Sequence, residues 1–112
     1  MTSYKKLIVI WYNDKDWGDT TFLDITNTLP KRSIKEVVDS PSETYVLLKN
    51  DCVIKMVRSV NQLHGRLADI IFIQDGTDKQ YIDYIIRHFV APDGVAEWFT
   101  SVKDVCDRAR GE

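Results

Sequence analysis

Five aspartates that follow two apolar runs are the residues in this sequence best suited to chemistry. Three follow the run at residues 7–12, and two follow the run at residues 70–73. They are Asp14, Asp16, Asp19, Asp75 and Asp78. Ligands of α/β proteins bind beyond the carboxyl ends of strands, so the two groups would converge if both runs were parallel neighbours.

Carboxylate oxygens are the ligands that Mg²⁺ prefers, and Mg²⁺ is the usual metal of phosphoryl transfer. One function that the spacing allows is therefore a Mg²⁺-dependent phosphoryl-transfer or nuclease-like enzyme that uses Asp14, Asp16 and Asp75. The competing interpretation is that these acids keep the strand ends solvated and cap the helices that follow.

Other catalytic or cofactor-binding patterns are missing from the sequence. There is no GxxxxGK[ST] loop, no GxGxxG after residues 7–12 and no GxSxG, and the five glycines are isolated. Cys52 and Cys106 lack CxxC spacing, and their apolar surroundings predict buried, reduced thiols, with Cys52 the more exposed at a hairpin tip. A pairing of either cysteine with His64 or His88 stays open. The leading hypothesis is a non-catalytic domain without a cofactor.

Aromatic residues gather around the end of the first apolar run. Trp17 lies between Asp16 and Gly18, in a segment whose periodicity gives it no core position. Since aromatic residues dominate the contacts that stabilise protein interfaces, Trp11, Trp17 and Asp16 are the predicted interaction residues. Alternatively, Trp17 folds back over the end of the sheet.

The bulk composition limits the class of protein. At 112 residues, 44% of them hydrophobic and 29% charged, the chain forms one domain, residues 1–112, with a substantial core. A net charge of -2 argues against a nucleic-acid partner, which a basic surplus would favour. Because no signal peptide and no membrane span are recognisable, we expect a cytoplasmic protein.

The pattern of apolar residues predicts alternating strands and helices. Strands are expected at 7–12, 33–38, 44–48, 53–58 and 69–74, and helices at 21–29, 79–90 and from Asp93 onward. The first and last strands are apolar throughout, as expected of central strands buried on both faces. The strand at 53–58 alternates less clearly and is placed nearer an edge. The expected fold is an α/β three-layer sandwich, a mixed sheet of about five strands with helices on both faces.

The segment 45–75 resembles the region before the Walker B acids in phage large-terminase-type packaging ATPases. The matching positions are Ser59, Gly65, Arg66, Ala68, Asp69, Ile70 to Ile73 and Asp75. The family's acidic pair is Gln74-Asp75 here, and the Walker A lysine loop is missing. The resemblance implies a trimmed relative without ATP hydrolysis, in which Asp75 is a vestigial metal-contacting carboxylate, and it favours a phage or mobile-element origin.

Together these observations favour a small regulatory domain that binds another protein, such as a phage-encoded regulator or a host-directed inhibitor. Homodimerisation through an edge strand of the hairpin at 44–58 is a further alternative.

Overall fold

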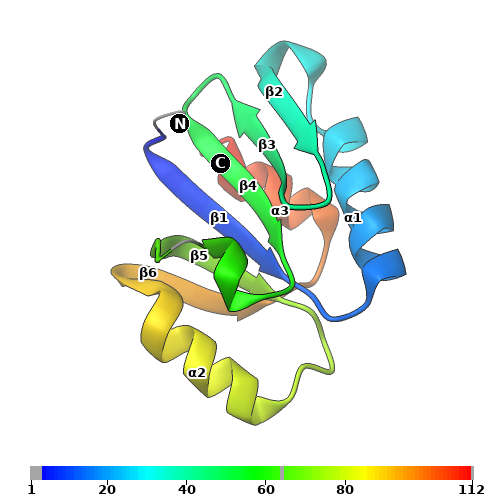
Figure 1. The fold of residues 1–112 in the computed structure, drawn as a ribbon. Coiled ribbons are helices and arrows are strands. Elements are labelled where there is room, and N and C mark those ends of the chain that lie inside the picture. Colours follow the sequence, from blue (N-terminus) through cyan, green and yellow to red (C-terminus); the bar gives the residue numbers. More distant parts are fainter. Residues whose placement is uncertain (1–3, 64, 112) are drawn as a thin grey trace.

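The two apolar runs form neighbouring parallel strands inside a six-stranded mixed sheet (Figure 1). The computed structural model describes residues 4–63 and 65–111. The strands are β1 (Lys6–Trp11), β2 (Ile34–Asp39), β3 (Thr44–Leu48), β4 (Cys52–Val57), β5 (Ala68–Ile73) and β6 (Val90–Trp98). Their spatial order is β2-β3-β4-β1-β5-β6. The pairing of β1 with β5 confirms the predicted relation between the two runs, and the sheet has six strands where about five were expected.

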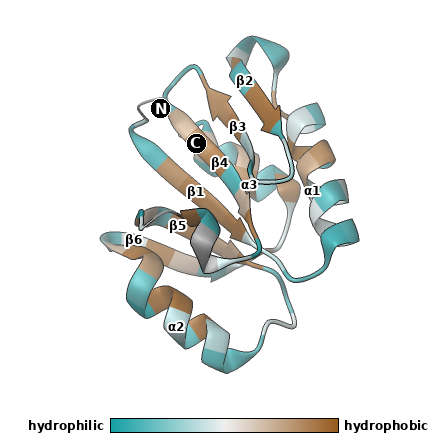
Figure 2. Cartoon of the chain, in the orientation of Figure 1, coloured by the Kyte–Doolittle hydropathy of each residue, from teal (hydrophilic) through white to brown (hydrophobic). Residues whose placement is uncertain are grey.

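Helices cover both faces of this sheet, which confirms the three-layer α/β sandwich (Figure 1). Helices α1 (Lys15–Thr28) and α3 (Val102–Ala109) pack on one face, and α2 (Lys79–Phe89) packs on the other with the short 3-10 turn η2 (Val60–Leu63). A second 3-10 turn, η1 (Lys31–Ser33), leads into β2. Strand β1 is hydrophobic along most of its length (Figure 2). Because successive side chains of a strand point to opposite faces of the sheet, those of β1 enter the two cores alternately.

Strand β4 lies between β3 and β1, so its predicted place near an edge is wrong. The mixed pattern that suggested an edge comes from Lys55. Its amine lies 3.3 Å from Glu43 Oε1, so the charge of Lys55 is paired although most of its side chain is buried. The predicted hairpin at 44–58 is present and turns at Asn50 and Asp51, with Asp51 in the left-handed region at φ 66°.

Helix α1 begins six residues earlier than the predicted start at Thr21. Asp14 is the N-cap, and its Oδ1 accepts hydrogen bonds from the backbone N–H groups of Asp16 and Trp17 at 2.9 and 3.2 Å. The prediction failed because the polar, glycine-containing sequence of the first turn is typical of a loop.

The C-terminal region differs most from the prediction. A helix starting at Asp93 was expected, but residues 90–98 form β6, and α3 starts only at Val102 with Ser101 as its N-cap. The apolar residues of this segment have helical spacing, but they belong to a strand and then to a helix, and Val95 and Trp98 are exposed. Pro92 is tolerated because β6 is at the edge of the described sheet, where it pairs with β5.

None of the helices in the described part of the chain has both the length and the apolar character needed to cross a membrane.

Candidate functional site

The carboxyl ends of four strands meet at one edge of the sheet. Strand β1 is parallel to both β4 and β5, and β5 is parallel to β6. The chain leaves β1 toward α1 on one face and leaves β5 toward α2 on the other face. Neighbouring strands whose connections diverge in this way form the usual ligand-binding crevice of open α/β sheets. The site predicted from the aspartates therefore falls at the expected position in the fold.

At this crevice the two loops are joined by side-chain hydrogen bonds. Gln74 Oε1 accepts from the backbone N–H of Asn13 at 2.8 Å and of Asp14 at 3.4 Å. The Asn13 amide donates to Thr77 Oγ1 at 2.9 Å, and the Thr77 hydroxyl donates to the Gln74 carbonyl at 2.7 Å. Thr77 is only 7% exposed. These contacts fix the loops after β1 and β5 relative to each other, so the polar groups at the crevice already serve the fold.

The predicted metal ligands Asp14, Asp16 and Asp75 follow the ends of these adjacent strands. The carboxylate of Asp14 is used as the cap of α1, and the side chains of Asp16 and Asp75 are exposed. Within residues 4–63 and 65–111, no group of three or more His, Cys, Asp or Glu side chains is arranged to hold a metal ion. The Mg²⁺-dependent enzyme therefore stays a prediction, and its basis is the position of these aspartates after adjacent parallel strands.

Trp17, one of the predicted contact residues, packs back over the end of the sheet. Its ring centroid lies 5.0 Å from that of Phe99 in an edge-on arrangement, and 6.4 Å from that of Tyr12. The Tyr12 ring is also 5.8 Å from the Arg58 guanidinium carbon. Burial raises the pKa of Tyr12, while the positive charge of Arg58 opposes that shift. This cluster seals the carboxyl edge of the core.

Trp11, the second predicted contact residue, is 3% exposed and belongs to the core on the α2 side of the sheet. Its side chain therefore adds almost nothing to the surface. Asp16, the third, is exposed in the first turn of α1.

Four other large apolar side chains, on α2 and β6, are exposed. Tyr81 is 60% exposed, Tyr84 46% and Ile86 44% on α2, and Trp98 at the end of β6 is 50% exposed. Tyr81 and Tyr84 were not among the predicted contact residues because they lie outside the apolar stripe of α2. The helical spacing that predicts helices at 79–90 and from Asp93 onward would bury Ile86 and Trp98, but both are exposed. The sequence did contain one indication of this exposed surface, which is the presence of two tyrosines outside the apolar stripe of an amphipathic helix.

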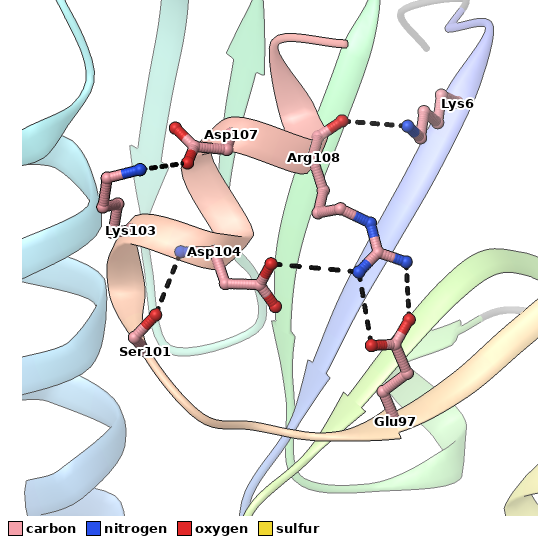
Figure 3. Close-up of polar contacts among 7 residues, drawn as sticks. All are labelled: Lys6, Glu97, Ser101, Lys103, Asp104, Asp107 and Arg108. Atoms are coloured by element: carbon pink, nitrogen blue, oxygen red, sulfur yellow. Dashed lines mark hydrogen bonds and ion pairs between the residues drawn. The ribbon is translucent and has the colours of Figure 1, made fainter. Parts of the chain in front are cut away.

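Polar contacts on the opposite face attach α3 to the sheet (Figure 3). The Arg108 guanidinium donates two hydrogen bonds to the Glu97 carboxylate, at 2.5 and 3.2 Å, and lies 3.9 Å from Asp104. The hydrogen bond from Arg108 lowers the pKa of Glu97. Lys6 Nζ donates to the Arg108 carbonyl at 2.9 Å. These groups are paired with one another, as expected of a structural network.

Both cysteines are free and buried, which confirms the predicted state of the thiols. Cys52 is 2% exposed, so the expectation that it is the more exposed of the two is wrong. Burial raises the pKa of each thiol to about 11, so neither is a ready nucleophile at neutral pH. His88 is exposed on α2 with its ring against Tyr84, and His64 lies outside the described residues.

The raised thiol pKa values predict a loss of stability in alkali. The ordinary thiol pKa is 9.0, so the stabilisation is fully present below that pH and is lost as pH rises through about 11. A rise from 9.0 to about 11 corresponds to about 3 kcal/mol per thiol. Urea unfolding between pH 7 and 11 measures the difference between wild type and a Cys52→Ala/Cys106→Ala variant, in which all other titrating groups cancel. A difference that stays constant across this range would disprove the prediction.

Asp69 and Asp75, two carboxylates of the terminase resemblance, have different surroundings. Asp69 Oδ2 accepts a hydrogen bond from the backbone N–H of Leu7 at 2.8 Å and so holds the start of β1. Asp75 lies in the exposed turn before Gly76, which has φ of 90°. Asp75 is exposed after β5, and among the described residues it belongs to no group of three or more His, Cys, Asp or Glu side chains that could hold a metal ion.

Comparison with protein-family models, with curated proteins and with solved structures gave no match to this chain, so its function has to be argued from its own surface and core.

Proposed function

We propose that this chain is a small protein-binding or regulatory domain that acts without catalysis, through the surface of α2 and β6. We define the α2–β6 surface by three exposed aromatic side chains: Tyr81, Tyr84 and Trp98. The observation that carries the proposal is their exposure, between 46% and 60%. Tyrosine and tryptophan supply much of the binding energy at protein interfaces, because they combine a large apolar area with a polar group.

The exposed aromatic residues are concentrated in one part of the molecule. Among the described residues, all the exposed Tyr, Trp and Phe side chains are in α2 or β6. The other exposed large apolar side chains are aliphatic: Leu23, Val37, Leu67, Ile86 and Val95. Single exposed aliphatic residues are normal on protein surfaces, whereas grouped aromatic residues often mark a contact surface.

The topology brings α2 and Trp98 to the same side of the sheet. Trp98 pairs in register with Ile73, which belongs to the core beneath α2. Paired residues of parallel strands direct their side chains to the same face, so Trp98 lies on the α2 face. Helix α2 begins, and β6 ends, at the carboxyl edge (Figure 1). Tyr81, in the first turn of α2, is therefore at the same end of the molecule as Trp98.

A phage-encoded regulator or host-directed inhibitor remains the class of protein that we propose. Its support is the absence of a phosphate-binding loop from this sequence and the resemblance of residues 45–75 to terminase sequences. Such a protein needs only a stable scaffold and one contact surface.

A comparison of partner capture by two double variants tests the proposed surface. Tyr81→Ser/Trp98→Ser removes two aromatic residues of the α2–β6 surface, and Leu23→Ser/Val37→Ser removes equally exposed aliphatic residues of α1 and β2. We expect a partner from native host lysate to be retained by wild type and by the control. The surface variant should retain at least about 10-fold less, since each lost aromatic contact costs about 2 kcal/mol. Circular dichroism must show that both variants are folded, and equal capture by all three proteins would reject the surface.

A further inference from the structure

The negative charge of the chain is concentrated in the segment that carries the α2–β6 surface. Residues 75–97 contain five acidic and two basic side chains, a net charge of -3. The whole chain has a net charge of -2, so the remaining residues together carry +1. An exposed aromatic surface is thus combined with a local acidic excess, on a protein that is otherwise close to neutral.

Most of these acids have no basic partner within the described chain. Glu97 is paired with Arg108. The other four acidic residues form no ion pair with a described residue and are exposed. They are Asp75, Asp78, Asp83 and Asp93. Asp78 caps α2, and Asp83 lies between Lys79 and Arg87 along the helix, so Asp75 and Asp93 are the acids whose charge is available to attract a binding partner.

The acids flank the exposed aromatic side of α2. Helical geometry places Tyr81 and Tyr84 on one flank of α2 with His88, and the rings of Tyr84 and His88 are in contact at 4.6 Å. Asp75 precedes the start of α2 at the carboxyl edge. Asp93, in the first half of β6, lies toward the opposite edge, where α2 ends. A ligand along this flank would meet acidic groups at both ends.

The outward ridge of α2 has a different character. Lys79, Asp83 and Arg87 follow one another at four-residue spacing, so they lie along one line of the helix. The signs alternate, and this ridge does not favour a ligand of either charge. The attraction is limited to the ends of the aromatic flank.

We propose that the occupant of the α2–β6 surface is a basic segment of another protein, with apolar residues between its lysines or arginines. This inference rests on the proposed function and names the chemistry of the partner. Apolar side chains of the segment pack on Tyr81, Tyr84 and Trp98, and its cations lie near Asp75 and Asp93. Nucleic acid and anionic lipid would be repelled by the same carboxylates, and a second copy of the chain would bring acidic groups against acidic groups.

Three synthetic peptides test this chemistry directly. They have one length and the same apolar residues, and their alternate positions are all Lys, all Ser or all Glu. Binding to the full chain is measured by fluorescence anisotropy of the labelled peptide, and its location by amide chemical shifts. We expect the Lys peptide to bind and to shift amides of α2 and β6, with affinity that decreases between low and high salt.

Two charge-reversal variants separate local from general electrostatics. Asp75→Lys/Asp93→Lys changes the ends of the aromatic flank, and Asp16→Lys/Asp24→Lys makes the same change in net charge on α1. We expect the first to weaken Lys-peptide binding about 10-fold and the second to leave it near the wild-type value. Absence of binding by the Lys peptide, equal binding of the Ser or Glu peptide, shifts confined to α1 or β2, or equal effects of the two variants would each overturn the inference.

The variant Tyr81→Ser/Trp98→Ser distinguishes an error in the chemistry of the partner from an error in the proposed function. If Tyr81→Ser/Trp98→Ser loses the lysate partner while Asp75→Lys/Asp93→Lys retains it, the surface binds protein and the basic partner is wrong. If both variants retain the partner, the α2–β6 surface itself is wrong.

Discussion

The Gly94→Ala variant is expected to lose about 3 kcal/mol or more of its free energy of unfolding. A Cβ at position 94 would lie 2.8 Å from the backbone carbonyl oxygens of Ala68 and Asp69 in β5. These oxygens belong to a strand held on both sides, by β1 and β6, so they cannot move away without breaking the sheet. The cost is steric, because the φ of Gly94 is not in the left-handed region.

This close approach follows from an irregularity in the pairing of β6. Between Ala68 and Ile70 of β5 the partner residue changes from Val90 to Val95, so β6 contains extra residues at this point. Glycine inside a strand often marks a bulge or a close backbone approach of this kind.

Urea unfolding of Gly94→Ala and of Gly76→Ala provides the measurement. Gly76 has φ of 90° and nothing within 4 Å of an added Cβ, so its replacement costs only the backbone strain, about 1–2 kcal/mol. The sign of the Gly94 result also tests the topology. If a helix started at Asp93, Gly94 would be in its first turn, where alanine is at least as favourable as glycine. A neutral or stabilising Gly94→Ala would therefore contradict strand β6.

The central part of the fold was predictable because its information is local. The apolar runs of β1 and β5 are long, β-branched and bounded by polar residues, so burial on both faces is indicated by the residues themselves. Strand β6 was not predictable in this way. Its apolar residues fit a period of 3.6, and Pro92 and Gly94 suggest a break, so only pairing with β5 makes it a strand.

The candidate functional site likewise has a part that was predictable from the sequence and a part that was not. The aspartates were found because carboxylates after strands are recognisable in sequence, and their predicted edge of the sheet is the one observed. Gln74 and Thr77 were not found, because their roles arise only when two loops far apart in sequence meet at Asn13. The exposure of Trp98 depends on the same long-range pairing that defines β6.

Gly18 is the second glycine whose replacement should have a large effect, and here the effect should depend on one neighbour. A Cβ at position 18 would lie 2.2 Å from Cε2 of the Tyr12 ring. That ring is held by Trp17 and lies beside the Arg58 guanidinium, so it must be displaced from the edge of the core. We expect Gly18→Ala to cost about 2 kcal/mol, less than Gly94→Ala because a side chain moves more easily than backbone.

Removal of the Tyr12 ring should reverse the sign of this effect. In a Tyr12→Ala background the obstacle is absent, and alanine is favoured over glycine inside helix α1 by about 1 kcal/mol. Gly18→Ala should therefore stabilise Tyr12→Ala, although it destabilises the wild type. A double-mutant cycle from urea unfolding gives the coupling, expected to be about 3 kcal/mol. Additive effects would mean that the ring does not lie across the first turn of α1. In that case Gly18 would owe its place to another cause, and the sealing of the carboxyl edge by Tyr12, Trp17 and Phe99 would be wrong.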